Sequence, residues 1–182
     1  MSKEDQKKAD FLAQEGKSLY QAKKYLLAAE SYHQAAGEYQ AAGNSLLEAE
    51  MRNNQCVALL QAKEPQQALE SVAGTEEIFL EAGQTTKAGM ALANQASAYQ
   101  DLGKRELAIE TFSKAGEIFL SADQGDLYLQ TMQSVSSMKF QSRDLIGALF
   151  AMQRGLEGVE KLTWRQKLLK NLLKVPDKLL NK

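Results

Sequence analysis

A chain of 182 residues is long enough for one globular domain or a short array of repeats, and with only two prolines it favours helix throughout. The formal net charge of −1 gives no global field that would attract nucleic acid, so we expect no nucleic-acid partner. The first ten residues lack the apolar core of a signal peptide and nowhere do eighteen apolar residues run together, which predicts a cytoplasmic protein that does not span a membrane.

The sequence repeats every forty residues without gaps. The repeats cover residues 5–44, 45–84, 85–124 and 125–164. One column of the alignment holds Ala28, Ala68, Ala108 and Ala148, and another holds the small residues Gly16, Cys56, Ala96 and Ser136. Four positions before the small column stand Leu12, Leu92 and Met132, with Arg52 as the exception. Spacings of three and four indicate helices, and a fixed period of this length indicates a solenoid.

Turn signals divide each repeat into two antiparallel helices. Gly43 and Gly83 stand at the ends of the first and second repeats, while Pro65 and Gly103 mark breaks in the middle of the second and third. We predict first helices over 6–22, 45–62, 86–102 and 126–142. We predict second helices over 25–42, 65–82, 105–122 and 145–161. No strand pattern competes.

A basic amphipathic segment, 165–182, follows the fourth repeat. Pro176 cannot continue a helix, so we predict a capping helix over 163–175. The residues expected to lie on the fourth hairpin are Leu168, Leu169, Leu172 and Val175. From residue 161 to the end, seven lysines and arginines stand against Asp177 alone, a net charge of +6. Three interpretations stay open for this tail: a solvated cap, an anchor on an anionic membrane surface, or docking on the chain itself or on a partner.

The third repeat carries a motif within residues 91–115. Its members are Ala96, Tyr99, Gly103, Ala108, Phe112 and Ala115. Their order and spacing resemble a tetratricopeptide repeat, and the forty-residue period resembles the longer repeats of the kinesin light chain type. The second and fourth repeats depart from the motif, because Thr75 and Gly155 replace the last alanine. The resemblance implies an all-α fold: a right-handed α-α superhelical solenoid of four helical hairpins plus a C-terminal capping helix.

Two residues that could suggest chemistry have simpler interpretations. Cys56 lies in the small column and is expected to be a buried packing residue, while His33 shares a column with mostly polar positions and is expected to face solvent. No Cys/His spacing suits a metal, and no glycine-rich phosphate-binding fingerprint occurs. We therefore expect no enzyme, with no catalytic residue, metal or cofactor.

The family resemblance implies that a peptide or a partner helix binds along the concave face that the first helices line. A polar column there reads Gln14, Asn54, Asn94 and Ser134. Asparagine is a poor interior helix former, so its recurrence has two interpretations: hydrogen bonds to a bound peptide, or a solvated polar surface. The predicted peptide-binding residues are Gln14, Lys17, Asn53, Asn54, Val57, Met90, Asn94, Ser97, Gln130 and Ser134.

The sequence lacks the basic clamp that would indicate a chaperone C-terminus as the partner. Tetratricopeptide domains that hold chaperone C-terminal carboxylates share a five-residue basic clamp, of which only Asn54 has its counterpart here. A neutral or helical segment of a protein partner is therefore favoured. The alternatives are a self-assembling structural scaffold, in which the ends of the array join copies into an oligomer, and a peripheral membrane adaptor that uses residues 161–182.

Overall fold

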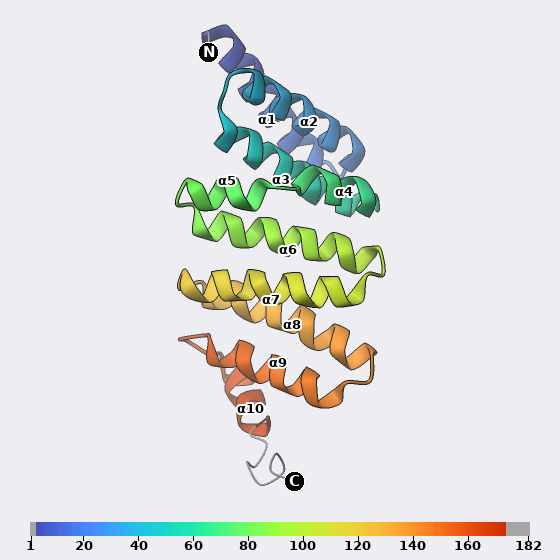
Figure 1. The fold of residues 1–182 in the computed structure, drawn as a ribbon, viewed down its shortest axis with the longest axis vertical. Coiled ribbons are helices and arrows are strands. Elements are labelled where there is room, and N and C mark those ends of the chain that lie inside the picture. Colours follow the sequence, from blue (N-terminus) through green and yellow to red (C-terminus); the bar gives the residue numbers. More distant parts are fainter. Residues whose placement is uncertain (1–2, 174–182) are drawn as a thin grey trace. The chain divides into compact units, whose positions relative to one another are not determined.

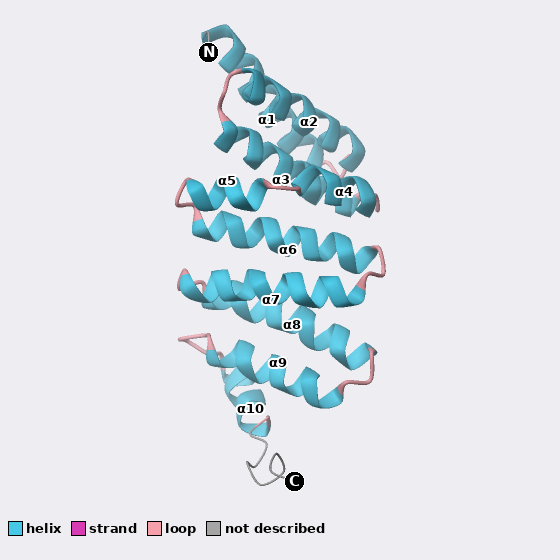
Figure 2. Ribbon diagram, viewed as in Figure 1, coloured by secondary structure: helices cyan, strands magenta, loops and turns pink. Residues whose placement is uncertain are grey.

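The structure is a computed structural model that describes residues 3–173, and within this range it contains helices and loops only (Figure 2). The helices of the four repeats are α1 (Lys3–Gln21), α2 (Tyr25–Ala41), α3 (Ser45–Gln61), α4 (Pro65–Val72), α5 (Thr75–Glu81), α6 (Thr85–Asp101), α7 (Arg105–Ser121), α8 (Gly125–Gln141) and α9 (Leu145–Glu157). The last described helix is α10 (Trp164–Leu172). The fold is thus an all-α array of helical hairpins, as the sequence predicts (Figure 1).

The first helices of the repeats, α1, α3, α6 and α8, begin and end within three residues of the predicted ranges. Each hairpin turn contains one residue with a positive φ. These residues recur every twenty positions, at Lys23, Gly43, Lys63, Gly83, Gly103, Asp123 and Arg143. The left-handed conformation ends one helix and reverses the chain, so the turns, like the helices, follow the period of the sequence.

The described residues form two compact units, divided between Thr111 and Phe112. In the first unit α2 packs against both α1 and α3, and α3 packs against α4, α5 and α6. The core of this unit contains Ala28, Ala68 and Cys56 with no exposed surface. At Gly16, an added Cβ would lie 2.9 Å from the ring of Tyr32. Close helix approach therefore explains why the small column excludes larger side chains.

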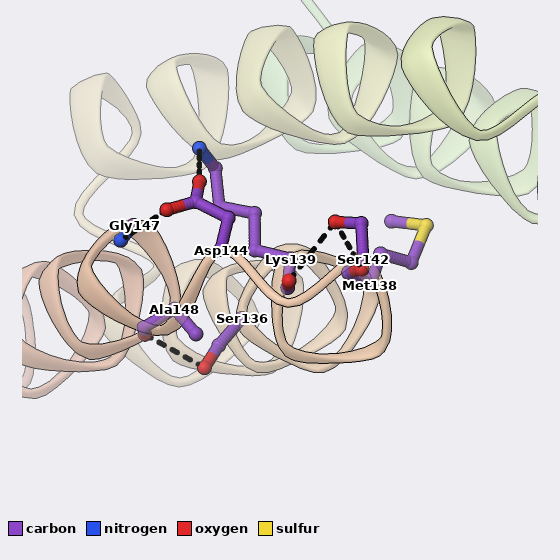
Figure 3. Close-up of polar contacts among 7 residues, drawn as sticks. All are labelled: Ser136, Met138, Lys139, Ser142, Asp144, Gly147 and Ala148. Carbon is purple, nitrogen blue, oxygen red and sulfur yellow. Dashed lines mark hydrogen bonds and ion pairs between the residues drawn. The ribbon is translucent and has the colours of Figure 1, made fainter.

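In the second unit α8 packs along α9. Ser136, the member of the small column in α8, donates a hydrogen bond from its hydroxyl to the carbonyl of Ala148 at 2.8 Å (Figure 3). Asp144 caps the start of α9, because its Oδ1 accepts from the backbone N–H of Gly147 at 2.8 Å and its Oδ2 accepts from Lys139 at 3.1 Å. These two bonds hold the pKa of the Asp144 carboxyl below its ordinary value.

One predicted helix, 65–82, is wrong, because the structure divides it into α4 and α5 at Ala73 and Gly74. Gly74 has φ +74° and begins α5 from the left-handed region. Arg52, the exception in its column, reaches this break: its Nε donates to the carbonyl of Ser71 at 3.0 Å, and its Nη2 donates to that of Ala73 at 2.6 Å. The arginine therefore satisfies carbonyls that the interruption leaves without a helical partner.

Helix α9 also differs from its prediction, since it ends at Glu157 instead of residue 161. A Cβ added at Gly158 would lie 2.3 Å from the ring of Tyr128, so the chain leaves the helix where it passes close to α8. A non-helical stretch then leads to Thr163, the residue that caps α10.

Helix α10 is shorter than the predicted 163–175, and Val175 lies outside the described residues. Leu169 and Leu173 line an apolar groove with residues of α8 and α9, but Leu168 and Leu172 are 54% and 74% exposed. The predicted packing of Leu168 and Leu172 on the fourth hairpin is therefore wrong. Among the helices of residues 3–173, none combines the length and the hydropathy that crossing a bilayer requires.

A candidate partner-binding groove

The candidate site is a groove of about 310 Å³ between α3 and α6 in the first unit. Its lining residues are Val57, Leu60, Gln61, Lys63, Asn94, Ser97, Gln100 and Asp101. We call it the α3–α6 groove. The residues of each helix follow one another at helical spacing, so a single face of α3 meets a single face of α6.

Two asparagines join the helices beside the groove. Asn94 of α6 donates from its Nδ2 to the Oδ1 of Asn53 of α3 at 2.8 Å, and both side chains are half-buried. An amide side chain carries two N–H donors and an oxygen with two lone pairs. The bond between the asparagines uses one donor and one lone pair, which leaves further capacity on both residues for the backbone of a partner.

Apolar surface and charge occupy different parts of the groove. Val57 and Leu60 of α3 are half-buried and supply its apolar contacts. Lys63 stands in the turn after α3 and Asp101 is the last residue of α6, and the lysine Nζ lies 3.8 Å from Oδ2 of the aspartate. The Lys63 side chain is 82% exposed, so this ion pair contributes little to stability. The groove therefore presents balanced charge, amides and a small apolar floor.

The structure brings four of the predicted residues together, namely Asn53, Val57, Asn94 and Ser97. The other predicted residues of the first unit, Gln14, Lys17, Asn54 and Met90, are exposed but do not line the groove. Gln130 and Ser134 belong to α8 in the second unit. The hydroxyls of Ser97 and Ser134 donate to carbonyls of their own helices, those of Ala93 and Gln130, and so offer a partner lone pairs.

Five residues of the lining are absent from the predicted peptide-binding residues: Leu60, Gln61, Lys63, Gln100 and Asp101. A signal was present, because Gln61 and Asp101 stand four and seven residues after Val57 and Asn94, which is the spacing of one helix face. Asn54 shares the column of Asn94, but in the structure its neighbour Asn53, which is also a predicted residue, bonds to Asn94.

Cys56 and His33, the two residues whose side chains could take part in chemistry, lie outside the groove. Cys56 is fully buried, and this burial raises the pKa of its thiol to about 12. A thiol in that state is not a nucleophile at neutral pH, which agrees with a packing role. His33 is exposed on α2, where a polar groove also contains Glu48 and Arg52. Arg52 donates hydrogen bonds to the backbone carbonyls at the break between α4 and α5.

A family model described as soluble NSF attachment protein, SNAP, matches residues 2–174. A comparison with curated protein sequences gives no match. The family match supports a tetratricopeptide-like helical repeat, but it does not support the kinesin light chain variant that the forty-residue period suggests. Since the match covers nearly the whole chain, the protein belongs to the soluble NSF attachment protein family, a family of helical-repeat adaptors that bind other proteins.

Proposed function

We propose that the protein is a non-enzymatic adaptor that binds an extended peptide or a partner helix in the α3–α6 groove. The observation that carries this proposal is the hydrogen bond between Asn53 and Asn94 beside the apolar floor of the groove. The other residues proposed to contact a partner are Gln14, Lys17, Asn54, Val57, Met90 and Ser97 in the first unit, and Gln130 and Ser134 in the second.

The spacing of the helices suits such a ligand. Packed helices lie about 10 Å apart, and an extended chain advances about 3.3 Å per residue, so a peptide crossing the helices meets a new one about every third residue. Asparagine amides match the donors and acceptors of a peptide backbone. Val57 and Leu60 would contact apolar side chains of the ligand, and the Lys63–Asp101 pair leaves no net charge that selects a strongly charged segment.

The family name records attachment to NSF, so NSF is the first partner to test. A cytoplasmic location for this encounter stays a prediction. The self-assembling scaffold also stays a prediction, and a mass measurement across protein concentration tests it directly: a constant monomer mass would exclude it.

The experiment compares the capture of NSF by the immobilised chain and by Asn53→Ala/Asn94→Ala. Each lost side-chain hydrogen bond is worth about 1 kcal/mol, so capture should weaken about tenfold or more. Both amides are half-exposed, and the melting temperature should change little. The matched control is Gln34→Ala/Gln66→Ala, because each glutamine also donates one hydrogen bond to a neighbouring glutamate at 2.8 Å, away from the groove. Equal capture by the two double variants would refute the groove as the site.

A further inference from the structure

The outward side of α10 is apolar. Trp164 and Leu172 are 70% and 74% exposed, and Leu168 between them is 54% exposed. A helix turns about 100° per residue, so positions spaced by four place these three side chains within an arc of about 80°. The three residues form a continuous stripe, which we call the α10 stripe, and large apolar side chains grouped in this way mark an interaction surface.

The opposite side of α10 already has its contacts. Leu169 and Leu173 line the apolar groove with Phe140 of α8 and Leu149 of α9. Lys170 donates from Nζ to the carbonyl of Leu156 at 3.4 Å. These contacts fix which side of the helix faces the hairpin, and the α10 stripe lies on the other side. Packing among residues 3–173 therefore does not account for the stripe.

Basic residues flank the stripe. The stretch 161–173 contains three lysines and one arginine without an acidic residue, a net charge of +4, while the rest of the chain carries −5. The guanidinium of Arg165 lies 5.2 Å from the centre of the Trp164 ring, and Lys167 is exposed on the other flank. A negatively charged surface would therefore be attracted to this helix rather than to the chain as a whole.

The helix is also preformed. Thr163 and Gln166 form a capping box: the Thr163 hydroxyl accepts from the Gln166 backbone N–H at 3.3 Å, and the Gln166 carboxamide oxygen accepts from the Thr163 N–H at 2.8 Å. Binding through the α10 stripe thus does not have to offset the loss of conformational entropy that folding a helix would cost.

We propose that α10 lies on the surface of anionic phospholipid membranes, with the α10 stripe at the boundary between headgroups and acyl chains and with Lys161, Arg165 and Lys167 against the lipid headgroups. A flat interface fits an outward stripe with cations at its sides, because tryptophan prefers the headgroup level and basic residues add attraction to anionic lipid. An acidic protein would use the same charges, and the experiment separates the two. This inference is independent of the α3–α6 groove.

The experiment measures binding of the full chain to phosphatidylcholine vesicles with and without phosphatidylserine. Trp164 is the only tryptophan, so its fluorescence reports on the proposed contact itself. At low salt we expect co-sedimentation with the anionic vesicles only, together with a shift of the tryptophan emission to shorter wavelength. Added salt should release the protein, because screening weakens the attraction of the lysines and arginine.

Two variants divide the interaction into charge and apolar contact. Lys161→Gln/Arg165→Gln/Lys167→Gln should weaken anionic-vesicle binding about fivefold per charge, on the order of a hundredfold in all. Leu168→Gln/Leu172→Gln keeps the charge but removes most of the stripe, and it should weaken binding on the order of tenfold per leucine. Because all five side chains are exposed or nearly so, both variants should keep the helicity of the parent chain.

Matched controls change the same residue types elsewhere. Lys7→Gln/Lys24→Gln/Lys104→Gln alters the net charge equally, and Leu80→Gln/Leu107→Gln replaces leucines that are each 45% exposed. Both controls should bind anionic vesicles as the parent does. The proposal is overturned by an absence of vesicle binding at low salt, by binding that survives the leucine variant, or by binding without a change in Trp164 emission. Capture of acidic proteins but not of vesicles would assign the helix to a protein partner and overturn it as well.

Discussion

The second hairpin, α3 with α4 and α5, and the fourth hairpin, α8 with α9, occupy equivalent places in the repeat but are built differently. In the fourth, Met132 is buried, and a Cβ added at Gly155 would lie 2.8 Å from its Cβ, so α9 approaches α8 closely and continues unbroken. In the second, the same two positions hold Arg52 and Thr75. There the helix breaks, and Arg52 bonds the freed carbonyls.

The two residues that depart from the repeat pattern in the second hairpin, Arg52 and Thr75, change together and both form hydrogen bonds near the break. Thr75 is fully buried and donates from its hydroxyl to the carbonyl of Val72 at 2.8 Å, one residue before the break. In the fourth hairpin Gly155 packs against the apolar side chain of Met132. In the second, Arg52 instead donates hydrogen bonds to carbonyls at the helix break. The forty-residue register survives because the substitution changes the local bonding and not the chain length.

The largest expected difference concerns the small column, where the second hairpin has Cys56 and the fourth has Ser136. Burial raises the pKa of Cys56 from 9.0 to about 12, so its thiolate fraction near pH 8 falls about a thousandfold. Alkylation by iodoacetamide should therefore be slow in the native protein and fast after denaturation. Ser136→Cys in a Cys56→Ala background should react faster, because position 136 is half-buried. Equal rates for the two cysteines would contradict the difference in burial.

Arg52→Met gives the second hairpin the residue of the fourth without its partner glycine. The two donors to Ser71 and Ala73 are lost, and hydrogen bonds from a charged group contribute about 1.5–3 kcal/mol each, part of which solvent recovers. We expect the free energy of unfolding to fall by about 3 kcal/mol, measured by urea denaturation. Unchanged stability would mean that water satisfies these carbonyls equally well.

Gly155→Thr makes the reverse exchange in the fourth hairpin. The new Cβ would meet the Cβ of Met132 at 2.8 Å, and overpacking of this kind costs about 2 kcal/mol. Thermal melting checks the expected loss. Gly37→Thr is the control for the effect of threonine in a helix, because a Cβ at Gly37 meets nothing within 4 Å. Similar losses for both variants would remove the close approach as the cause.

The smallest effect concerns a feature that the two hairpins share. Lys63 and Arg143 turn the chain with φ values of 64° and 65°, a conformation that glycine adopts without strain. Lys63→Gly and Arg143→Gly should each raise the free energy of unfolding by about 0.5–1 kcal/mol in chemical denaturation. The gain for Lys63 should be slightly smaller, because its ion pair with Asp101 is lost. A loss of stability for both variants would show that the higher conformational entropy of glycine in the unfolded chain outweighs the relief of backbone strain in the folded one.

Much of the fold was predictable because the period sets the length of each hairpin. The break at Gly74 was not, since its freed carbonyls bond to Arg52 of another helix, a tertiary contact that no local pattern contains. The turns at Lys63 and Arg143 contain no glycine that would indicate a positive φ. The only sign of it was that both positions lie twenty residues from Gly43, Gly83 or Asp123, where the other turns occur. Likewise, the predicted residues Val57, Asn94 and Ser97 line the α3–α6 groove, but the columns did not show that Asn53 bonds to Asn94 across the two helices.

The central claim, that a partner binds in the α3–α6 groove, is tested most directly by placing a photo-crosslinking residue at Val57 and, in a second variant, at His33. Val57 lines the groove, whereas His33 is exposed on α2. Irradiation of each variant with the proposed partner should yield a covalent complex from position 57 and none from position 33. Crosslinking from position 33 with none from position 57 would contradict the account.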